Sequence, residues 1–177
     1  MKVFINPGHD ILCDPGACGN GLKEAEIVRD VSELLEEYLV NAGIEVVGNL
    51  QDDSLRYICA SANQWGDDGI IFVSVHCNAA TNTLARGTEV FICPQSYRAR
   101  PIANFVQSQI VNSIGTINRG VKEANYHVLT RTLMPAILVE LAFITNEDDA
   151  EILRTKKDEF AKAIARGITD YVQWSRL

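Results

Sequence analysis

The sequence predicts an α/β fold: a single domain in which a mostly parallel, twisted sheet of about six strands is covered by helices on both faces. Three observations lead to this prediction. Short apolar runs alternate with helical patterns along the whole chain. The run at 70–75 is nearly all apolar, which is typical of a strand buried on both faces. The chain has 177 residues, 47% hydrophobic and 22% charged, which suits one globular domain spanning 1–177.

The first three elements follow from residue type and spacing. Residues 3–5 are β-branched or aromatic and end at an Asn-Pro-Gly turn, which predicts a short strand. Over 22–42 apolar side chains recur at the spacing of one helical face, and the helix is expected to end at Gly43. An apolar run at 44–47 then predicts the second strand.

The middle of the chain continues this alternation. A helix is expected over 54–65, where the Ser54 hydroxyl can cap the first turn. The buried strand at 70–75 follows, and strand-forming residues recur at 88–93. A third helical pattern covers 98–113.

The last third of the chain completes the layers. Residues 126–129 are expected to be extended, and 136–139 are wholly apolar, as in a buried strand. The last helix is expected from about 156 to 172, with Phe160 and Ile164 on its apolar face. Strands separated by helices need crossover connections, which produce a parallel sheet with helices on both sides.

The composition excludes several classes of protein. Asp and Glu outnumber Lys and Arg by 23 to 16, which gives a net charge of −7, so no nucleic-acid binding by a basic surface is expected. No run approaches the ~20 apolar residues of a membrane span, so we expect no membrane insertion. The first apolar run is too short for the ~7–15-residue core of a signal peptide, and no signal peptide is expected.

Cysteines and histidines are few. The five cysteines are irregularly spaced and form no Cys-x-x-Cys motif, which argues against a disulfide framework. We expect reduced, mostly buried thiols. Of the three histidines, His127 is expected to be structural or solvated, whereas His9 and His76 occupy more informative positions.

Chemically active side chains follow three of the predicted strands. The first strand leads to His9, the third leads to His76, and the strand at 136–139 leads to Glu140. Because ligands of such sheets bind at the carboxyl ends of the strands, we expect these side chains at one edge. Two imidazoles and a carboxylate suit a divalent metal and its chemistry.

The helix over 22–42 contributes a further carboxylate. Its apolar stripe, extended back by one turn, reaches Glu24, whereas Glu26 falls on the opposite face. A buried carboxylate is costly unless it is paired or binds a metal. The alternative is that Glu24 is a first-turn acid that complements the helix dipole.

These four residues suggest a catalytic zinc site. His9, Glu24 and His76 supply the three protein ligands, and the fourth position stays open for water. A structural site would instead be closed by a fourth protein ligand. Glu140 is then free to act as the general base that takes a proton from the water.

Two features around this site have more than one interpretation. Asp10 or Asp14 is expected to orient a ligand histidine through its second ring nitrogen. Cys77 and Cys18 lie near the predicted ligands in sequence, and a thiolate from either would close a structural zinc site. Small buried thiols are the alternative.

Short motifs along nearly the whole chain resemble the zinc-dependent N-acetylmuramoyl-L-alanine amidases, a family of cell-wall hydrolases. The resemblance covers residues 3 to about 155. The matching motifs are Gly-His at 8–9, Asp-Pro-Gly-Ala at 14–17, Gly-Leu-Lys-Glu at 21–24, Val-Ser-Val-His-Cys-Asn-Ala at 73–79, Gly-Thr-Glu-Val-Phe at 87–91, Arg-Gly-Val-Lys at 119–122, Val-Leu at 128–129 and Met-Pro-Ala to Thr-Asn at 134–146.

The resemblance implies hydrolysis of the amide bond between N-acetylmuramic acid and L-alanine in peptidoglycan. Zn²⁺ would be the cofactor, held by His9, Glu24 and His76, and Glu140 would be the catalytic base. Asn78 matches an asparagine of the family pattern and is the candidate substrate-binding residue, with hydrogen bonding in a turn as its alternative role.

The resemblance leaves the stem-peptide specificity and the biological setting open. A zinc carboxypeptidase acting on peptidoglycan stem peptides is the alternative activity, and Arg119 or Arg131 would then bind the substrate carboxylate. After the first histidine, Asp10-Ile11 replaces the usual Gly-Gly, a variant more similar to phage endolysins of clostridia. We expect a monomer that acts at the cell wall, either as an endolysin or as the catalytic domain of a secreted autolysin.

Overall fold

The computed structural model describes residues 1–176 and contains a six-stranded sheet in the order β4-β1-β5-β8-β6-β7. A separate two-stranded ribbon, β2-β3, precedes the first helix. The strands are β1 (Lys2–Pro7), β2 (Cys18–Gly19), β3 (Leu22–Lys23), β4 (Glu45–Asn49), β5 (Ile70–Asn78), β6 (Thr88–Ile92), β7 (Asn118–Glu123) and β8 (Ala136–Phe143). The predicted sheet of about six strands is confirmed.

The sheet is mostly parallel, as predicted, with one reversal. Strands β4, β1, β5 and β8 run in the same direction, β6 runs antiparallel to β8, and β7 is parallel to β6. No helix lies between β5 and β6 in the chain. The start of β6 therefore lies at the same edge of the sheet as the end of β8.

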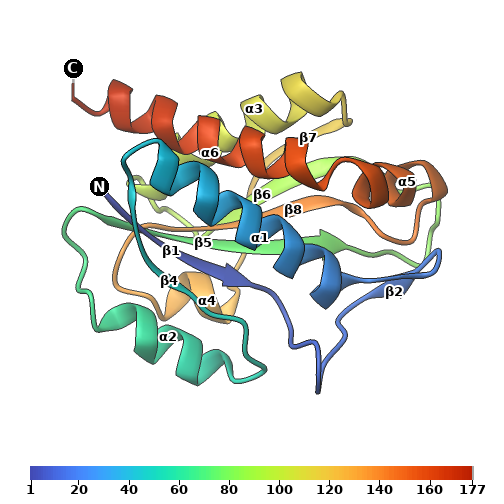
Figure 1. Cartoon of the computed structure of the whole chain (residues 1–177), viewed down its shortest axis with the longest axis horizontal. Coiled ribbons are helices and arrows are strands. Elements are labelled where there is room, and N and C mark those ends of the chain that lie inside the picture. The colour runs from blue at the N-terminus through green and yellow to red at the C-terminus, as the bar shows by residue number, and fades with distance from the viewer. Residues whose placement is uncertain (177) are drawn as a thin grey trace.

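Helices cover both faces of the sheet (Figure 1). One face carries α1, α3 and α6, with α5 leading into α6, and the other face carries α2 and α4 (Figure 1). The helices are α1 (Glu24–Asn41), α2 (Leu55–Asn63), α3 (Ala99–Ile114), α4 (His127–Thr130), α5 (Glu147–Thr155) and α6 (Lys157–Trp174). Among residues 1–176, none of these helices has both the length and the apolar character needed to cross a bilayer.

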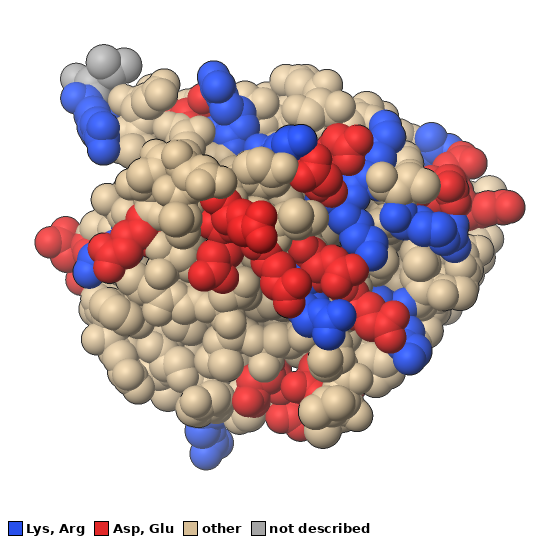
Figure 2. All heavy atoms as spheres, in the orientation of Figure 1, with Lys and Arg blue, Asp and Glu red and all other residues tan. Residues whose placement is uncertain are grey.

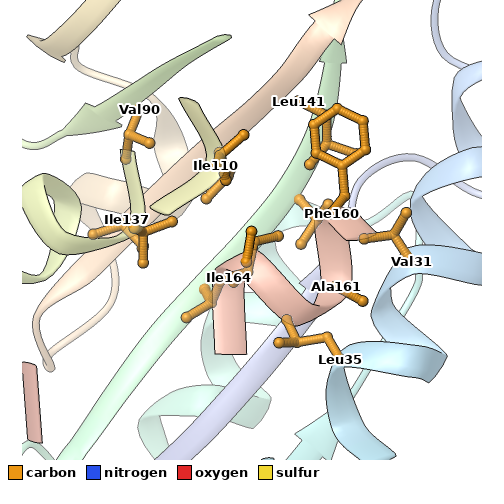
Figure 3. Close-up of a cluster of buried hydrophobic side chains, with 14 of the residues drawn as sticks. Val31, Leu35, Val90, Ile110, Ile137, Leu141, Phe160, Ala161 and Ile164 are labelled. Carbon is orange, nitrogen blue, oxygen red and sulfur yellow. The ribbon is translucent and has the colours of Figure 1, made fainter. Parts of the chain in front are cut away.

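The larger core lies between the sheet and the α1, α3 and α6 layer (Figure 3). Leu35, Ile110 and Phe160 are fully buried there, and burying each such side chain contributes about 1.5–3 kcal/mol. The packing of α6 against α3 depends on Gly167, where a Cβ atom would lie 2.6 Å from the Cα atom of Val106. A smaller core under α2 and α4 forms one wall of the site described below.

Three parts of the fold differ from the sequence predictions. The expected extended segment at 126–129 is wrong, because the N–H groups of Leu129 and Thr130 donate to the Tyr126 carbonyl and close a helical turn. Strand β7 and helix α5 were not predicted. Strands β5 and β8 are also longer than expected, so that His76 and Glu140 lie within them rather than beyond their ends.

Candidate metal centre

The four predicted site residues meet at one edge of the sheet. His9 follows β1, Glu24 begins α1, and His76 and Glu140 lie on β5 and β8. In the parallel register β5 is paired with β1 on one side and with β8 on the other, and His76 is directly opposite Glu140. Adjacent strands therefore bring together side chains that are up to 131 positions apart in the sequence.

His9, Glu24 and His76 converge on one point. Their ligand atoms all lie within 4.8 Å of one another. One oxygen of Glu24 is 3.1 Å from His9 Nε2, and the other is 3.0 Å from His76 Nδ1. The two imidazole rings are 5.3 Å apart and nearly perpendicular. The carboxylate therefore lies between the two rings, with both of its oxygens facing them.

Two glycines make room for the rings. A Cβ atom on Gly8 would lie 2.3 Å from His76 Cε1, and one on Gly16 would lie 2.6 Å from His9 Cδ2. Gly16 also has φ +66°, and His9 itself has φ 61°, both in the left-handed region. The chain therefore turns sharply after β1 and folds back against the imidazole of His9.

The partner of His9 is Asp14, one of the two aspartates considered from the sequence. His9 Nδ1 lies 2.7 Å from Asp14 Oδ2, which fixes the ring with Nε2 toward Glu24. Asp10 instead accepts hydrogen bonds from the N–H groups of Leu12 and Cys13 and closes the turn between them. The hydrogen bond with Glu24, opposed by burial and reinforced by Asp14, raises the pKa of His9 to about 9.

Glu24 is a buried and fully engaged carboxylate, with an exposure of 3%. The backbone N–H of Ala17 donates to Oε2, and the N–H of Cys77 donates to Oε1. Burial alone would raise the pKa of Glu24, but hydrogen bonds from both histidines and from Ala17 hold it well below its usual value. Glu24 is thus kept ionised in the interior, as a metal ligand must be.

Glu140 has the opposite environment. Its Oε2 atom is buried and has no hydrogen-bond partner among residues 1–176. Burial, together with the negative charges of Glu24 and Glu89, raises the pKa of Glu140 to about 8. A carboxyl group that is free of partners and titrates near neutrality is suited to proton transfer.

A cavity of about 290 Å³ opens beside these groups. His9, His76 and Glu140 form its polar side. The rest of its lining is largely apolar and includes Leu55, Ile58, Tyr126, Val128 and Leu138. His127 also lines this cavity, although the sequence suggested only a structural or solvated role. Sequence reasoning missed this wall because the segment that carries Tyr126 and His127 was expected to be an extended strand.

Asn78 lies apart from the cavity. Its Nδ2 donates to Glu89 Oε1 at 2.6 Å, and its Oδ1 accepts from the backbone N–H of Ala79. Both polar atoms of the side chain are therefore engaged within the protein. A direct contact between Asn78 and substrate stays a prediction, and it would use the second N–H of Nδ2 or the second lone pair of Oδ1.

The cysteine thiols lie outside the metal-ligating set of the described residues, which consists of His9, Glu24 and His76. Cys77 and Cys59 are buried as expected, and burial raises the pKa of the Cys77 thiol. The expectation of buried thiols is wrong for Cys13 and Cys18, which are exposed.

On the face of the molecule that carries α1, acidic side chains gather over this helix, with lysines and arginines between them (Figure 2).

Comparison with known proteins points to one family. A family model described as N-acetylmuramoyl-L-alanine amidase matches residues 3–170. The chain is 39% identical to the uncharacterized protein YqiI of Bacillus subtilis, over 96% of this chain and 84% of that protein. It is 35% identical to the sporulation-specific N-acetylmuramoyl-L-alanine amidase of the same organism, over 94% of this chain and 65% of that protein.

A solved structure shares both the fold and part of the sequence. N-acetylmuramoyl-L-alanine amidase AmiC2 of Nostoc punctiforme superimposes with a TM-score of 0.89 at 30% identity. The match covers 98% of this chain and 97% of that one. The similarity therefore includes the sheet, the helices on both faces and the edge at which the four site residues meet.

Proposed function

The chain belongs to the N-acetylmuramoyl-L-alanine amidase family, and on this premise we propose that it hydrolyses the amide between N-acetylmuramic acid and L-alanine in peptidoglycan. The observation that carries the proposal is the convergence at one sheet edge of His9, Glu24 and His76 with Glu140, whose Oε2 atom has no hydrogen-bond partner among residues 1–176. All four groups come from one chain, which supports activity as a monomer. The substrate would bring the protein to the cell wall.

The ligand set fits zinc. Two imidazole nitrogens and one carboxylate oxygen are ligands that Zn²⁺ prefers, and three protein ligands leave a position open for chemistry. Glu24 is held ionised, and Asp14 holds the His9 ring from its second nitrogen, as carboxylates do for histidines that bind metals. We therefore propose Zn²⁺ as the cofactor, held by His9, Glu24 and His76.

In the proposed hydrolysis, the metal and Glu140 have different roles. A zinc ion at this site supplies a Lewis acid that activates water and polarises the scissile carbonyl. Glu140 would accept the proton of the attacking water at its carboxylate, because it lines the same cavity as His9 and His76. The same carboxyl then delivers the proton to the nitrogen of the leaving L-alanine, which completes hydrolysis of the amide.

Replacing the base tests this assignment. We expect Glu140→Ala to keep one zinc per chain and to lose about 10²–10⁴-fold in kcat, the range that general base catalysis contributes. Glu45→Ala is the matched control, because Glu45 is 59% exposed at the start of β4, at the opposite end of the sheet from the site. Metal content and release of peptide from purified peptidoglycan are the two measurements.

The products separate this reaction from the alternative one. An amidase releases stem peptides with a new amino terminus at L-alanine, whereas a carboxypeptidase releases a single C-terminal amino acid. Normal digestion by Glu140→Ala would show that the mechanism is wrong. Activity that survives removal of zinc by a chelator would refute the role of the metal.

A further inference from the structure

Beside Glu140, on the neighbouring strands, lies a charged cluster that the proposed reaction does not use. Its centre is Glu89, which is 4% exposed. Arg119 Nε donates to Glu89 Oε2 at 2.8 Å, and Lys122 Nζ donates to the same oxygen. Asn78 Nδ2 donates to the other oxygen. One buried carboxylate therefore holds two cationic side chains in fixed positions.

The cluster continues the surface on which Glu140 lies. Glu89 of β6 is directly opposite Glu140 of β8, so their Cβ atoms are about 4.5–5.5 Å apart on the same face of the sheet. Phe91 follows Glu89 by two residues on that face, and Lys122 of β7 is its register partner. The path from Glu140 across Glu89 to Lys122 thus follows one face of three adjacent strands.

The cluster has a surplus of positive charge that reaches solvent. Two cations share one carboxylate, and the side chains of Arg119 and Lys122 remain 32% and 40% exposed, against 5% for Glu89. The neighbouring cations are already matched, since Arg86 pairs with Asp148 and Arg100 pairs with Glu123. The ammonium and guanidinium groups of the cluster retain donors for an incoming anion.

The fold alone does not explain this arrangement. A carboxylate at Glu89 is costly to bury, and like charges directly opposite each other, as at Glu89 and Glu140, destabilise a sheet. An apolar residue at this position would stabilise the sheet at least as well. The carboxylate instead fixes Arg119 and Lys122 beside the reaction centre.

We propose that Arg119 and Lys122, anchored by Glu89, bind the α-carboxylate of the second residue of the stem peptide, an inference that rests on the proposed amidase activity. This α-carboxylate is free where the peptide continues through the side-chain carboxyl of that residue. Two residues beyond the scissile bond span about 7 Å of extended peptide. The two strand spacings from β8 to β7 total about 10 Å, and the side chains of Arg119 and Lys122 close the difference. The peptide then crosses β6, and the apolar cavity faces the sugar side of the substrate.

A pair of matched substrates tests this carboxylate-binding subsite, formed by Arg119 and Lys122. We would compare muramoyl tripeptides that differ only at the second residue, which carries either a free α-carboxylate or the neutral amide. The zinc-loaded protein is expected to cleave the carboxylate form with about tenfold higher kcat/KM, mainly through KM. Tenfold corresponds to about 1.4 kcal/mol, near the low end for a hydrogen bond to a charged group.

Variants of Lys122 test whether the preference for the carboxylate substrate over the amide substrate depends on the cluster. Lys122→Met is expected to lower kcat/KM about tenfold for the carboxylate form and less than twofold for the amide form. Lys122→Arg should retain the preference. Arg100→Met is the matched control, because Arg100 is a partly exposed cation in an ion pair with Glu123 at the far end of β7. Thermal unfolding of each variant establishes that it is folded.

The outcomes separate this inference from the proposed function. Equal cleavage of both tripeptides by the unmodified protein would overturn the subsite and leave the amidase activity intact. An equal loss on both substrates in Lys122→Met would show a structural role and would also overturn it. Failure of the zinc-loaded protein to cleave either tripeptide would refute the amidase proposal itself.

Discussion

Glu140 offers a sharp test of the site, because its ionisation and the stability of the fold are linked. Its Oε2 atom is buried without a partner, and its pKa is raised from 4.5 to about 8, first by burial and then by the charges of Glu24 and Glu89. Glutamine has nearly the same shape and cannot ionise. Glu140→Gln in the metal-free protein should therefore remove a destabilising charge at high pH.

Proton linkage gives the sign and the size of the change in unfolding free energy that Glu140→Gln should cause. Between pH 4.5 and 8 the folded protein keeps a proton on Glu140 that the unfolded chain has lost, so stability falls as pH rises through this window. At 1.36 kcal/mol per pKa unit the full shift is worth roughly 5 kcal/mol. Because Glu140 borders the open cavity, water screens part of this, and we expect Glu140→Gln to gain about 2 kcal/mol between pH 5 and pH 8.

Urea unfolding at pH 5, 6, 7 and 8 measures this difference. His9 also has a raised pKa, but both proteins contain it, so the difference between them isolates Glu140. Glu45→Gln, at an exposed position, is the control and should show no pH-dependent gain. Added zinc should reduce the difference in stability between Glu140→Gln and the unmodified protein, because a neighbouring cation lowers the pKa of a carboxyl group. If the unfolding free energies of Glu140→Gln and of the unmodified protein change equally with pH, the raised pKa of Glu140 is refuted.

Two further substitutions test the support of the site and of the core. Asp14→Asn removes the carboxylate that holds the His9 ring and should weaken zinc binding about 10–100-fold in competition with a chromophoric chelator. Unchanged affinity would mean that His9 is oriented without it. Gly167→Ala places a Cβ atom 2.6 Å from Val106 Cα and should cost about 1–3 kcal/mol in urea unfolding. A loss of unfolding free energy below about 0.5 kcal/mol would show that α3 and α6 can shift apart enough to accommodate the methyl group.

The parts of the site that the sequence predicted are those that depend on local periodicity and on the parallel direction of the strands. Glu24 is buried because it continues the apolar stripe of α1 by one turn, and that stripe is visible in the residues themselves. His9, His76 and Glu140 lie at one edge because their strands are parallel, which the alternation of strands and helices implies. They meet there because β5 lies between β1 and β8, an order that the sequence did not predict. The edge of the sheet at which each residue lies therefore follows from patterns within its own segment.

The parts that the sequence did not predict depend on contacts between distant segments or on competing local bonds. The sequence left Asp10 and Asp14 equivalent, and only the turn geometry assigns Asp10 to the backbone and Asp14 to His9. Glu89 and Lys122 are 33 positions apart, and their ion pair requires β6 and β7 to be neighbours. Because β7 was not predicted, the cationic cluster beside the site could not be predicted either.

Glu24 and Glu140 lie at the same edge of the sheet, and their environments differ in the way that their two proposed roles require. Glu24 begins a helix, where backbone N–H groups and two imidazoles surround it and keep it charged. Glu140 lies within a strand, and its Oε2 atom has no hydrogen-bond partner among residues 1–176. Hydrogen bonds to the ionised form lower the pKa of a carboxyl group and make it a weaker base, whereas burial raises the pKa. These two environments support the proposal that Glu24 binds the metal and that Glu140 moves the proton.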